Sequence, residues 1–390
     1  MKKLKIVTVG NLARNAKFFT EVLNEKYEIT NILINEKPIQ ITQDIVISRG
    51  DNPILICINI IKAYYHLFTS DLIVSFTASL SSVLFRFFFV QFKRKKYIAY
   101  ATGSDLREAI YYPNNGKIVS KFFKKADIVV FHNNDENTLN SIRHLALKNL
   151  YWHNMYKQTE FNESLVDKTY IHNSVLCRSV LDFVDGSFSI FMPSWIEYRD
   201  EKKIEKYFCS KGNDLAYDAL IRFVKKHPKT KIVLRGVGID TDHAKKTLNI
   251  ISDNIMYVES LNKKDLINLM SIFDVILDQF YLGVFGGIAL EAASIGMPLL
   301  TNPPRIDYYL EDKYPFLQNQ NANEIYENLI LLHDDKDFRA QYAYLCKAWV
   351  IRNHSSFEYN KLGNVIDKLI IEGRFENGRP NNGGFFDDPL

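Results

Sequence analysis

Short apolar runs alternate with amphipathic stretches along most of this 390-residue chain, and no other feature constrains its fold as much. The run Lys5–Val9 ends at Gly10 and is followed by an amphipathic stretch over residues 11–23. This order is the strand, turn and helix unit of a parallel α/β sheet. Further strands are expected at residues 32–34, 71–76, 97–101 and 126–131. We therefore predict a doubly wound α/β domain over residues 1–175.

The same alternation begins again near residues 187–192, so a second domain of the same kind is expected over residues 185–340. Its strands are predicted at residues 231–234, 255–258, 275–278 and 298–301, and its helices at residues 214–226, 263–272 and 287–295. The helical stretch 341–371 is expected to return toward the first domain, and the Gly/Pro-rich tail 372–390 to be poorly ordered. A chain of 390 residues exceeds what one core usually serves, which favours two domains facing a central cleft.

Composition argues against several classes of function. The formal net charge is only +4, which gives no indication of nucleic-acid binding. The four cysteines form no CxxC pair, so neither a disulfide framework nor a zinc site is predicted. The start of the chain, MKKLKIVTVG, holds too short an apolar run for a signal peptide. No uncharged apolar run reaches the ~18–20 residues of a membrane span. We expect a cytoplasmic protein.

The stretch 274–302, DVILDQFYLGVFGGIALEAASIGMPLLTN, combines a strand end, a glycine-rich loop and a helix start. Gly283, Gly286 and Gly287 precede the helix, where glycines let backbone N–H groups approach a ligand closely. The amino end of a helix carries about half a positive charge, which suits a diphosphate. Glu291, about one turn into the helix, could accept hydrogen bonds from two neighbouring sugar hydroxyls. The pattern indicates a nucleotide diphosphate lying across the helix start, with its ribose held by Glu291.

This stretch resembles the signature of retaining GT-B glycosyltransferases of family four, which reads E-G-F-G-x-x-x-x-E-A-x-A-x-G-x-P. The chain matches it at Phe285, Gly286, Glu291, Ala292, Gly296 and Pro298. The resemblance implies two Rossmann-like domains. In the family the first glutamate faces the donor sugar and the second holds the ribose, so Glu291 takes the second role. Gly283 stands where the first glutamate would be. Asp278 is the candidate substitute, or else it only caps the loop.

Two further stretches extend the resemblance over most of residues 187–371. CSKGND at residues 209–214 is similar to the family's K-G-x-D segment, in which a lysine neutralises the donor diphosphate. Lys211 takes that position, and the alternative is a solvated lysine beside a turn. KIVLRGVG at residues 231–238 is similar to the family's next strand, where Gly236 would permit close packing against the nucleotide. Arg235 could reach a phosphate or face solvent.

In the first domain, ATGSDLR at residues 101–107 resembles a G-S-D-x-R loop of some relatives and implies an acceptor side. The residues expected there are Gly103, Ser104 and Asp105, with Gly10 and Asn11 at the first strand-to-helix turn. Asp105 would orient an acceptor or donor hydroxyl, and the alternative is a helix N-cap, a frequent place for Ser and Asp. Under this resemblance Asp105 and Asp278 are the candidate catalytic residues.

Metal and dinucleotide sites are weaker interpretations. Two D-x-D spacings occur, Asp240/Asp242 and Asp335/Asp337, but both stand next to predicted helix starts, where aspartate is frequent as a cap. No metal ligand is therefore predicted. The G-x-G of residues 236–238 lacks the third glycine of a dinucleotide site, because Thr241 stands in its place.

The stretch VLFRFFFVQFKRKK at residues 83–96 ends in four consecutive basic residues. We favour a buried helix followed by a solvated basic turn. The alternative is a peripheral contact with an anionic membrane, at the inner face of the plasma membrane, where a lipid-linked acceptor would lie.

The resemblance implies a metal-independent hexosyltransferase that moves a sugar, with retention, from a nucleotide-diphosphate sugar to an acceptor. The donor would be UDP- or GDP-linked, and the acceptor a glycan or lipid-linked saccharide of bacterial cell-surface polysaccharide biosynthesis. No cofactor beyond this substrate and no nucleic acid is expected. Two alternatives stay open. One is a non-catalytic, glycosyltransferase-like binding protein, motivated by the missing first glutamate, and the other is a sugar-nucleotide epimerase on the same scaffold.

Overall fold

The computed structural model divides the chain into two compact units, residues 1–156 with 356–390, and residues 157–355. It describes all residues except 1–2, 11–14, 35–42, 49, 77–94, 102–105, 107–119, 133–135, 154–165, 199–210, 260, 282, 284, 303–314, 356 and 374–390. Among the described residues, no helix has both the length and the apolar character that crossing a bilayer requires.

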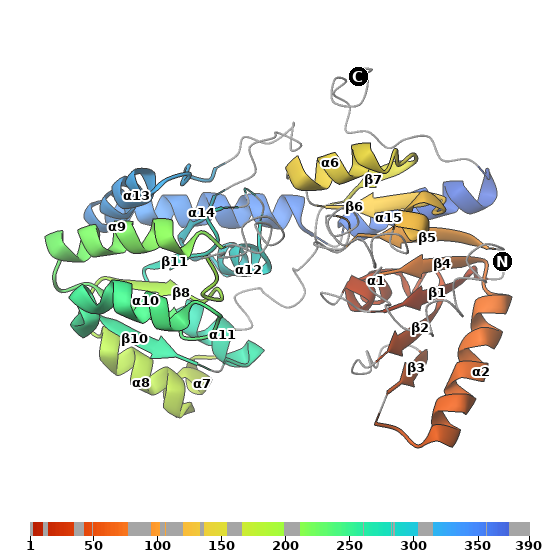
Figure 1. Ribbon diagram of the computed structural model, residues 1–390, viewed down its shortest axis with the longest axis horizontal. Coiled ribbons are helices and arrows are strands. Elements are labelled where there is room, and N and C mark those ends of the chain that lie inside the picture. Colours follow the sequence, from red (N-terminus) through yellow and green to blue (C-terminus); the bar gives the residue numbers. More distant parts are fainter. Residues whose placement is uncertain are drawn as a thin grey trace. The chain divides into compact units, whose positions relative to one another are not determined.

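The described residues of the first unit form a seven-stranded, all-parallel sheet in the order β3-β2-β1-β4-β5-β6-β7 (Figure 1). Its strands are β1 Lys5–Val9, β2 Glu28–Ile34, β3 Gln43–Ile47, β4 Leu72–Ser75, β5 Lys96–Tyr100, β6 Ile128–Phe131 and β7 Leu150–Trp152. The chain enters in the middle of the sheet and adds strands first on one side and then on the other. β4 and β6 are buried at every position, as expected for parallel strands covered on both faces.

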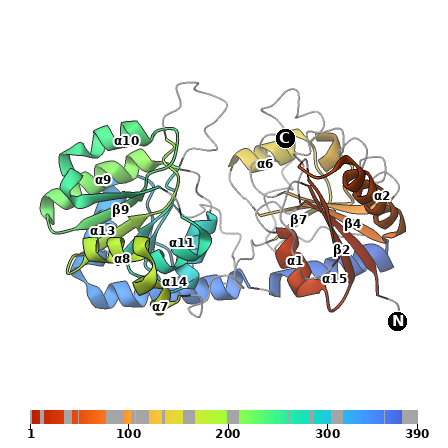
Figure 2. The ribbon, with the colours of Figure 1, turned by 90° about the horizontal axis from the view of Figure 1, so that it is seen from below.

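The helices described in this unit are α1 Asn15–Leu23, α2 Pro53–Thr69, α6 Glu136–His144 and α15 Phe357–Ile371. The last of these comes from the far end of the sequence and lies beside α1 (Figure 2). The Tyr27 hydroxyl donates to the Gly363 carbonyl and to the Asp367 carboxylate, each at 2.8 Å, and Lys26 pairs with Asp367 at 2.5 Å. Tyr359 is fully buried in the core of the same unit.

The described residues of the second unit form a five-stranded parallel sheet in the order β10-β9-β8-β11-β12. Its strands are β8 Ser189–Met192, β9 Lys231–Arg235, β10 Ile255–Val258, β11 Val275–Leu277 and β12 Leu299–Leu300. Its helices are α7 Lys168–Asn173, α8 Val175–Val184, α9 Asn213–Lys226, α10 Thr241–Thr247, the 3-10 helix η5 Leu248–Asn254, α11 Lys263–Met270, α12 Gly287–Ser294, α13 Ala322–Asp334 and α14 Lys336–Asn353. The chain again forms the central strand, β8, first. It then adds β9 and β10 on one side of β8, and β11 and β12 on the other.

The predicted fold class, with two doubly wound parallel sheets, is confirmed. Each predicted strand overlaps an observed one, and β3 and β7 were not predicted. They lie at the two edges of the first sheet, so neither needs the near-continuous apolar run that marks a central strand. The contacts divide the chain between residues 156 and 157, so α7 and α8 pack with the second unit, whereas the sequence-based division was placed at 175–185. Of the stretch 341–371, α14 also belongs to the second unit and only α15 to the first. The tail prediction falls outside the described residues from 374 onward.

Candidate functional site

A cavity of about 350 Å³ lies at the carboxyl ends of the strands in the second unit. It is lined by Ser194, Trp195, Glu197, Lys211, Arg235, Asp278, Gln279, Gly286, Gly287 and Ile288. These residues follow β8, end β9, follow β11 and begin α12. The order in which the chain adds strands reverses between β8 and β11, and open parallel sheets bind ligands at such a point.

Lys211 is held in the cavity wall by backbone hydrogen bonds to two loops. Its N–H donates to the Glu197 carbonyl at 2.9 Å, and its own carbonyl accepts the Phe280 N–H at 2.8 Å. Gly212 follows at φ 65°, and a Cβ there would lie 2.9 Å from the Tyr281 nitrogen, so the turn into α9 requires glycine. The Lys211 ammonium donates to Gln279 Oε1 at 3.2 Å. A cation is thus anchored beside the start of α12.

Asp278 is the buried carboxyl group of this cavity, with only 3% of the residue exposed. Burial raises its pKa from 3.8 to about 6, although the nearby Lys211 ammonium and the Ala289 backbone N–H favour the ionised form. Its Oδ2 is buried without a hydrogen-bond partner. A Cβ at Gly286 would lie 2.5 Å from that oxygen, so glycine at the start of α12 leaves room for the carboxyl group.

Arg235 stands at the end of β9, with its guanidinium carbon 5.8 Å from the centre of the Trp195 ring. Its Nε is buried without a hydrogen-bond partner, which leaves a charged donor available at the cavity wall. At the neighbouring Gly236 a Cβ would lie 3.3 Å from Tyr257 Cβ, so the backbone packs closely there. Two cationic side chains, Lys211 and Arg235, therefore line a cavity that also holds a helix amino end, a combination that suits an anion.

Glu291 lies in α12 but is not among the residues that line the cavity. Its side chain is 3% exposed, and Oε1 pairs with the Lys263 ammonium at 2.5 Å. Its Oε2 is buried with no hydrogen-bond partner. One oxygen of this carboxylate is therefore paired with a lysine whose side chain is 35% exposed. The other oxygen can still accept a hydrogen bond.

The other predicted donor-side residues lie in three different surroundings: the cavity lining, the loop before α12 and the core. Gly287 lines the cavity, and Gly283 adopts φ 56° in the preceding loop. Phe285 is buried, with its ring 4.9 Å from that of Phe316 and 5.6 Å from that of Trp349. Its side chain thus belongs to an aromatic cluster in the core and not to the cavity lining.

On the predicted acceptor side only Gly10 lies within the described residues. It directly follows β1 with φ 76°, and its N–H donates to the Ile32 carbonyl at 2.9 Å. The predictions for Asn11, Gly103, Ser104 and Asp105 fall outside the described residues.

One aspartate of each D-x-D pair accepts a backbone N–H. Asp335 caps α14 by accepting the Phe338 N–H at 2.8 Å, and Asp240 accepts the Tyr198 N–H at 2.7 Å. Within the described ranges, the group with the residue types and spacing of a metal site is His227, His333 and Asp334. His227 caps the carboxyl end of α9, whereas Lys211 precedes its amino end, so this group is separate from the cavity.

Sequence reasoning missed several cavity residues. Ser194, Trp195 and Glu197 follow β8, and Gln279 follows Asp278. Sequence reasoning also missed Lys263, which pairs with Glu291 outside the cavity lining. The loop after the first strand of a doubly wound sheet is a general ligand position, and that rule could have identified the first three. Nothing in the residue pattern indicated the Lys263 contact, because it depends on how α11 packs against α12.

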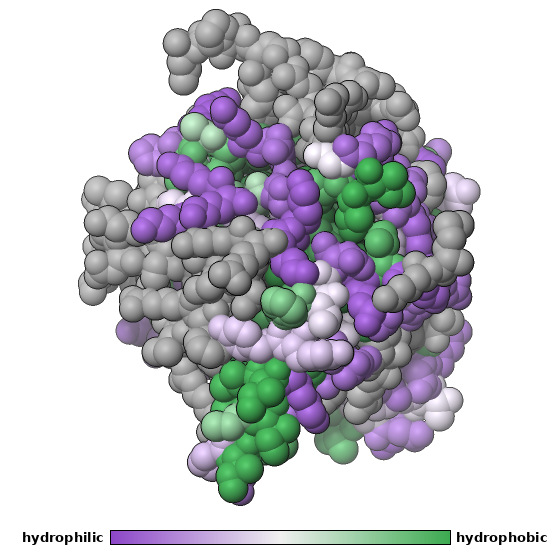
Figure 3. All heavy atoms as spheres, turned by 90° about the vertical axis from the view of Figure 1, so that its right-hand side faces the viewer, coloured by the Kyte–Doolittle hydropathy of each residue, from purple (hydrophilic) through white to green (hydrophobic). Residues whose placement is uncertain are grey.

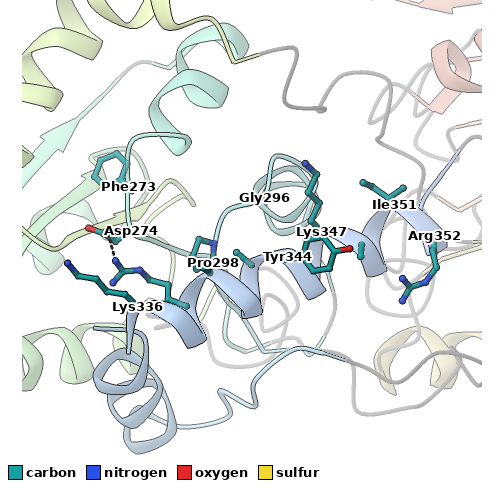
Figure 4. Close-up of a pocket in the computed structure, with 13 residues that line it drawn as sticks. Phe273, Asp274, Gly296, Pro298, Lys336, Tyr344, Lys347, Ile351 and Arg352 are labelled. Carbon is teal, nitrogen blue, oxygen red and sulfur yellow. Dashed lines mark ion pairs between the residues drawn. The ribbon is translucent and has the colours of Figure 1, made fainter. Parts of the chain in front are cut away.

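A second cavity, of about 790 Å³, lies along α14 in the same unit (Figure 4). Asp274, Gly296 and Pro298 line it, and these residues precede β11 and β12, so it is at the amino ends of the strands. Asp274 pairs with Arg339 at 3.0 Å inside it. The smaller cavity at the carboxyl ends is the better candidate site, because parallel sheets bind ligands at that edge.

No protein-family model matches the chain, and no curated protein matches it by sequence. Solved structures do match. HepE from Anabaena, in complex with UDP and glucose, is 14% identical with a TM-score of 0.66 over 94% of this chain and 100% of that chain. A glycosyltransferase from Rickettsia africae ESF-5 is 15% identical with a TM-score of 0.66 over 96% and 100%. A candidate UDP-N-acetylglucosamine 2-epimerase from Listeria monocytogenes is 15% identical with a TM-score of 0.55 over 97% and 99%. At these identities the likeness establishes the fold, which is the predicted GT-B fold.

Proposed function

We propose that this protein is a glycosyltransferase that moves a sugar from a nucleotide-diphosphate sugar to an acceptor hydroxyl. The observation that carries the proposal is the cavity in which Lys211 and Arg235 face the glycine-led start of α12. Among its fold neighbours, HepE has been solved with UDP and with UDP-glucose. A UDP- or GDP-linked hexose is the donor that we propose, with no metal and no further cofactor.

In this proposal the diphosphate lies against the backbone N–H groups of Gly287 and Ile288 and beside the Lys211 ammonium. Both are fixed before the reaction, so they stabilise the negative charge that develops on the leaving diphosphate without further reorganisation. The acceptor oxygen forms a bond to the anomeric carbon, and the bond from that carbon to the β-phosphate oxygen breaks with its electron pair. The acceptor proton goes to the departing diphosphate, and no covalent protein–sugar intermediate forms.

Glu291 is proposed to accept hydrogen bonds from the two ribose hydroxyls. Its unpartnered Oε2 supports this role, and Lys263 holds the other oxygen in place. Asp278 is proposed to face the donor sugar where the family's first glutamate is replaced by Gly283. Its position in the cavity wall supports that assignment. Asp105 is the residue that we propose for orienting the acceptor hydroxyl, and Gly10, Asn11, Gly103 and Ser104 are the other acceptor-side residues that we propose.

The acceptor class that we propose is a glycan or lipid-linked saccharide of bacterial cell-surface polysaccharide synthesis, with retention at the anomeric carbon. Both rest on the sequence resemblance, as does a cytoplasmic location at the inner face of the plasma membrane. Retention depends on which face of the sugar meets the acceptor, and a product of known anomeric configuration decides it.

Product analysis tests the function. The purified protein is incubated with UDP- and GDP-linked hexoses, with and without lipid and glycan acceptor extracts. Nucleoside diphosphate released only when acceptor is present, together with a new glycoside, is the expected result. A donor converted to its epimer without acceptor would instead identify an epimerase, the activity named for one fold neighbour. Donor binding without turnover would identify a non-catalytic binding protein.

A further inference from the structure

Helix α2 of the first unit exposes a row of large apolar side chains. Its sequence is PILICINIIKAYYHLFT, and it packs against β3 and β1. The exposed fractions are 70% for Ile54, 43% for Ile58, 69% for Ile61, 63% for Tyr65 and 63% for Phe68. Such residues occur singly on most protein surfaces, but a contiguous group of them marks an interaction site.

The spacing of these residues places them on one face of the helix. They follow one another by four, three, four and three positions, which is the repeat of a single stripe along an α-helix. The buried residues Ala63 and Leu67 belong to the opposite side, against the sheet. Figure 3 shows apolar side chains gathered at the lower end of this face of the molecule, where α2 descends in Figure 1. α2 is thus apolar toward the sheet and apolar toward solvent.

Two lysines, Lys62 and Lys95, carry positive charge at this face, although Glu28 is close enough to His66 of α2 to interact with it and Asp71, just past the helix, is exposed. No Asp or Glu occurs in α2, and Lys62 lies on the exposed side next to Ile61. Lys95 reaches the carboxyl end of the helix, with its ammonium 5.8 Å from the centre of the Phe68 ring and 2.8 Å from the Ser70 carbonyl. The nearest acidic residues along the sequence, Asp51 and Asp71, accept backbone N–H groups of Ser48 and Lys5.

We propose that the exposed face of α2 docks on the surface of an anionic lipid bilayer. The apolar stripe supplies side chains that enter the acyl boundary, and the ammonium groups of Lys62 and Lys95 remain at the level of lipid phosphates. Tyr65 has an apolar ring and a polar hydroxyl, which suits the same boundary. The inner side of α2 stays on the sheet, so the helix lies along the bilayer surface. This inference stands on α2 and Lys95 and does not depend on the proposed activity.

Vesicle sedimentation tests the proposal. The full-length protein is mixed with vesicles of phosphatidylcholine, or of phosphatidylcholine with an equal amount of phosphatidylglycerol. The variant Ile61→Glu introduces a charge at the centre of the stripe, and Ile250→Glu is the matched control. Ile250 is 65% exposed in η5 of the second unit, so both substitutions alter exposed isoleucines. Melting temperature and nucleotide binding are measured for every variant, so that loss of folding or of the donor site is recognised separately.

The expected result is binding to the anionic vesicles that falls at least about tenfold in Ile61→Glu and is unchanged in Ile250→Glu. Lys62→Gln should reduce the preference for anionic over neutral vesicles by about fivefold. Absence of vesicle binding by the unaltered protein, or equal binding by both glutamate variants, would overturn the proposal. So would a dimer in light scattering that Ile61→Glu abolishes while vesicle binding is absent, because the face would then join two copies of this chain.

Discussion

The carboxyl group of Asp278 is buried with one oxygen unpartnered, which is a costly state for an ionised group. Its pKa, raised to about 6, means that the folded protein holds this proton more tightly than the unfolded chain does. The cost is therefore fully present above pH ~6 and disappears below pH ~4. Buried carboxyl groups with a raised pKa are typical of binding and catalytic sites.

Asp278→Asn should consequently stabilise the protein at pH 8. A pKa raised from 3.8 to about 6 corresponds to about 3 kcal/mol. We expect a gain of about 1–3 kcal/mol, because the new amide also needs partners. The gain should shrink as the pH falls from about 6 to about 4, since the wild-type carboxyl group becomes neutral there. Urea unfolding at several pH values measures it. A constant difference across this range would show that the carboxylate is not the source of the cost.

Glu291→Ala should weaken donor binding more than tenfold, because two hydrogen bonds between ribose hydroxyls and a carboxylate are lost. It also leaves the Lys263 ammonium without its carboxylate partner. Lys263 is partly exposed, so water can solvate it and the fold should survive. Titration of the nucleotide by calorimetry measures the loss, and Glu327→Ala, at an exposed position of α13, is the control. Equal affinities for both variants would remove Glu291 from the site.

At the scale of elements, the beginning of α12 depends on a glycine that no other residue can replace without movement. Gly286→Ala would bring a Cβ to within 2.5 Å of Asp278 Oδ2. We expect a loss of about 1–3 kcal/mol in the free energy of unfolding and a weaker nucleotide site. The double substitution with Asp278→Ala removes the contact, so it should restore part of the loss. Gly50→Ala is a control, because its nearest atom is 3.9 Å away. No coupling between the two positions would contradict this geometry.

Strands and loops with a clear local sequence pattern are the parts of the site that a sequence can predict. β4, β6 and β9 are apolar enough to be predicted alone, and glycines before an apolar helix predict the loop of α12. Gly286 was predicted from this pattern, and Lys211, Arg235 and Asp278 from the family resemblance. The structure brings all four to one cavity. β3 is an edge strand whose polar and apolar residues alternate weakly. The Glu291–Lys263 pair joins α12 to α11. Such a contact depends on how the two helices pack, which a local sequence pattern does not predict.

At the scale of the whole molecule, the last helix completes the core of the first unit. Tyr359, Leu362, Ile366 and Leu369 of α15 are buried there among residues of β1, β4 and α1. Truncation after Ser355 should therefore expose that core and make the first unit sensitive to protease. Truncation after Gly373 keeps α15 and should leave it resistant. Limited proteolysis followed by mass spectrometry compares the two chains. Equal resistance would show that the first unit folds without its carboxyl-terminal helix.

We propose that the second unit binds a nucleoside diphosphate at Lys211 and the start of α12. A thermal-shift titration with UDP, GDP, ADP and CDP, each with and without magnesium, tests it most directly, because a ligand of the folded state raises the melting temperature. We predict that UDP or GDP stabilises the protein without metal, and that Lys211→Ala loses this effect while Lys229→Ala, at an exposed position, keeps it. No shift with any nucleotide, or an equal shift in both variants, would rule out nucleotide binding at Lys211.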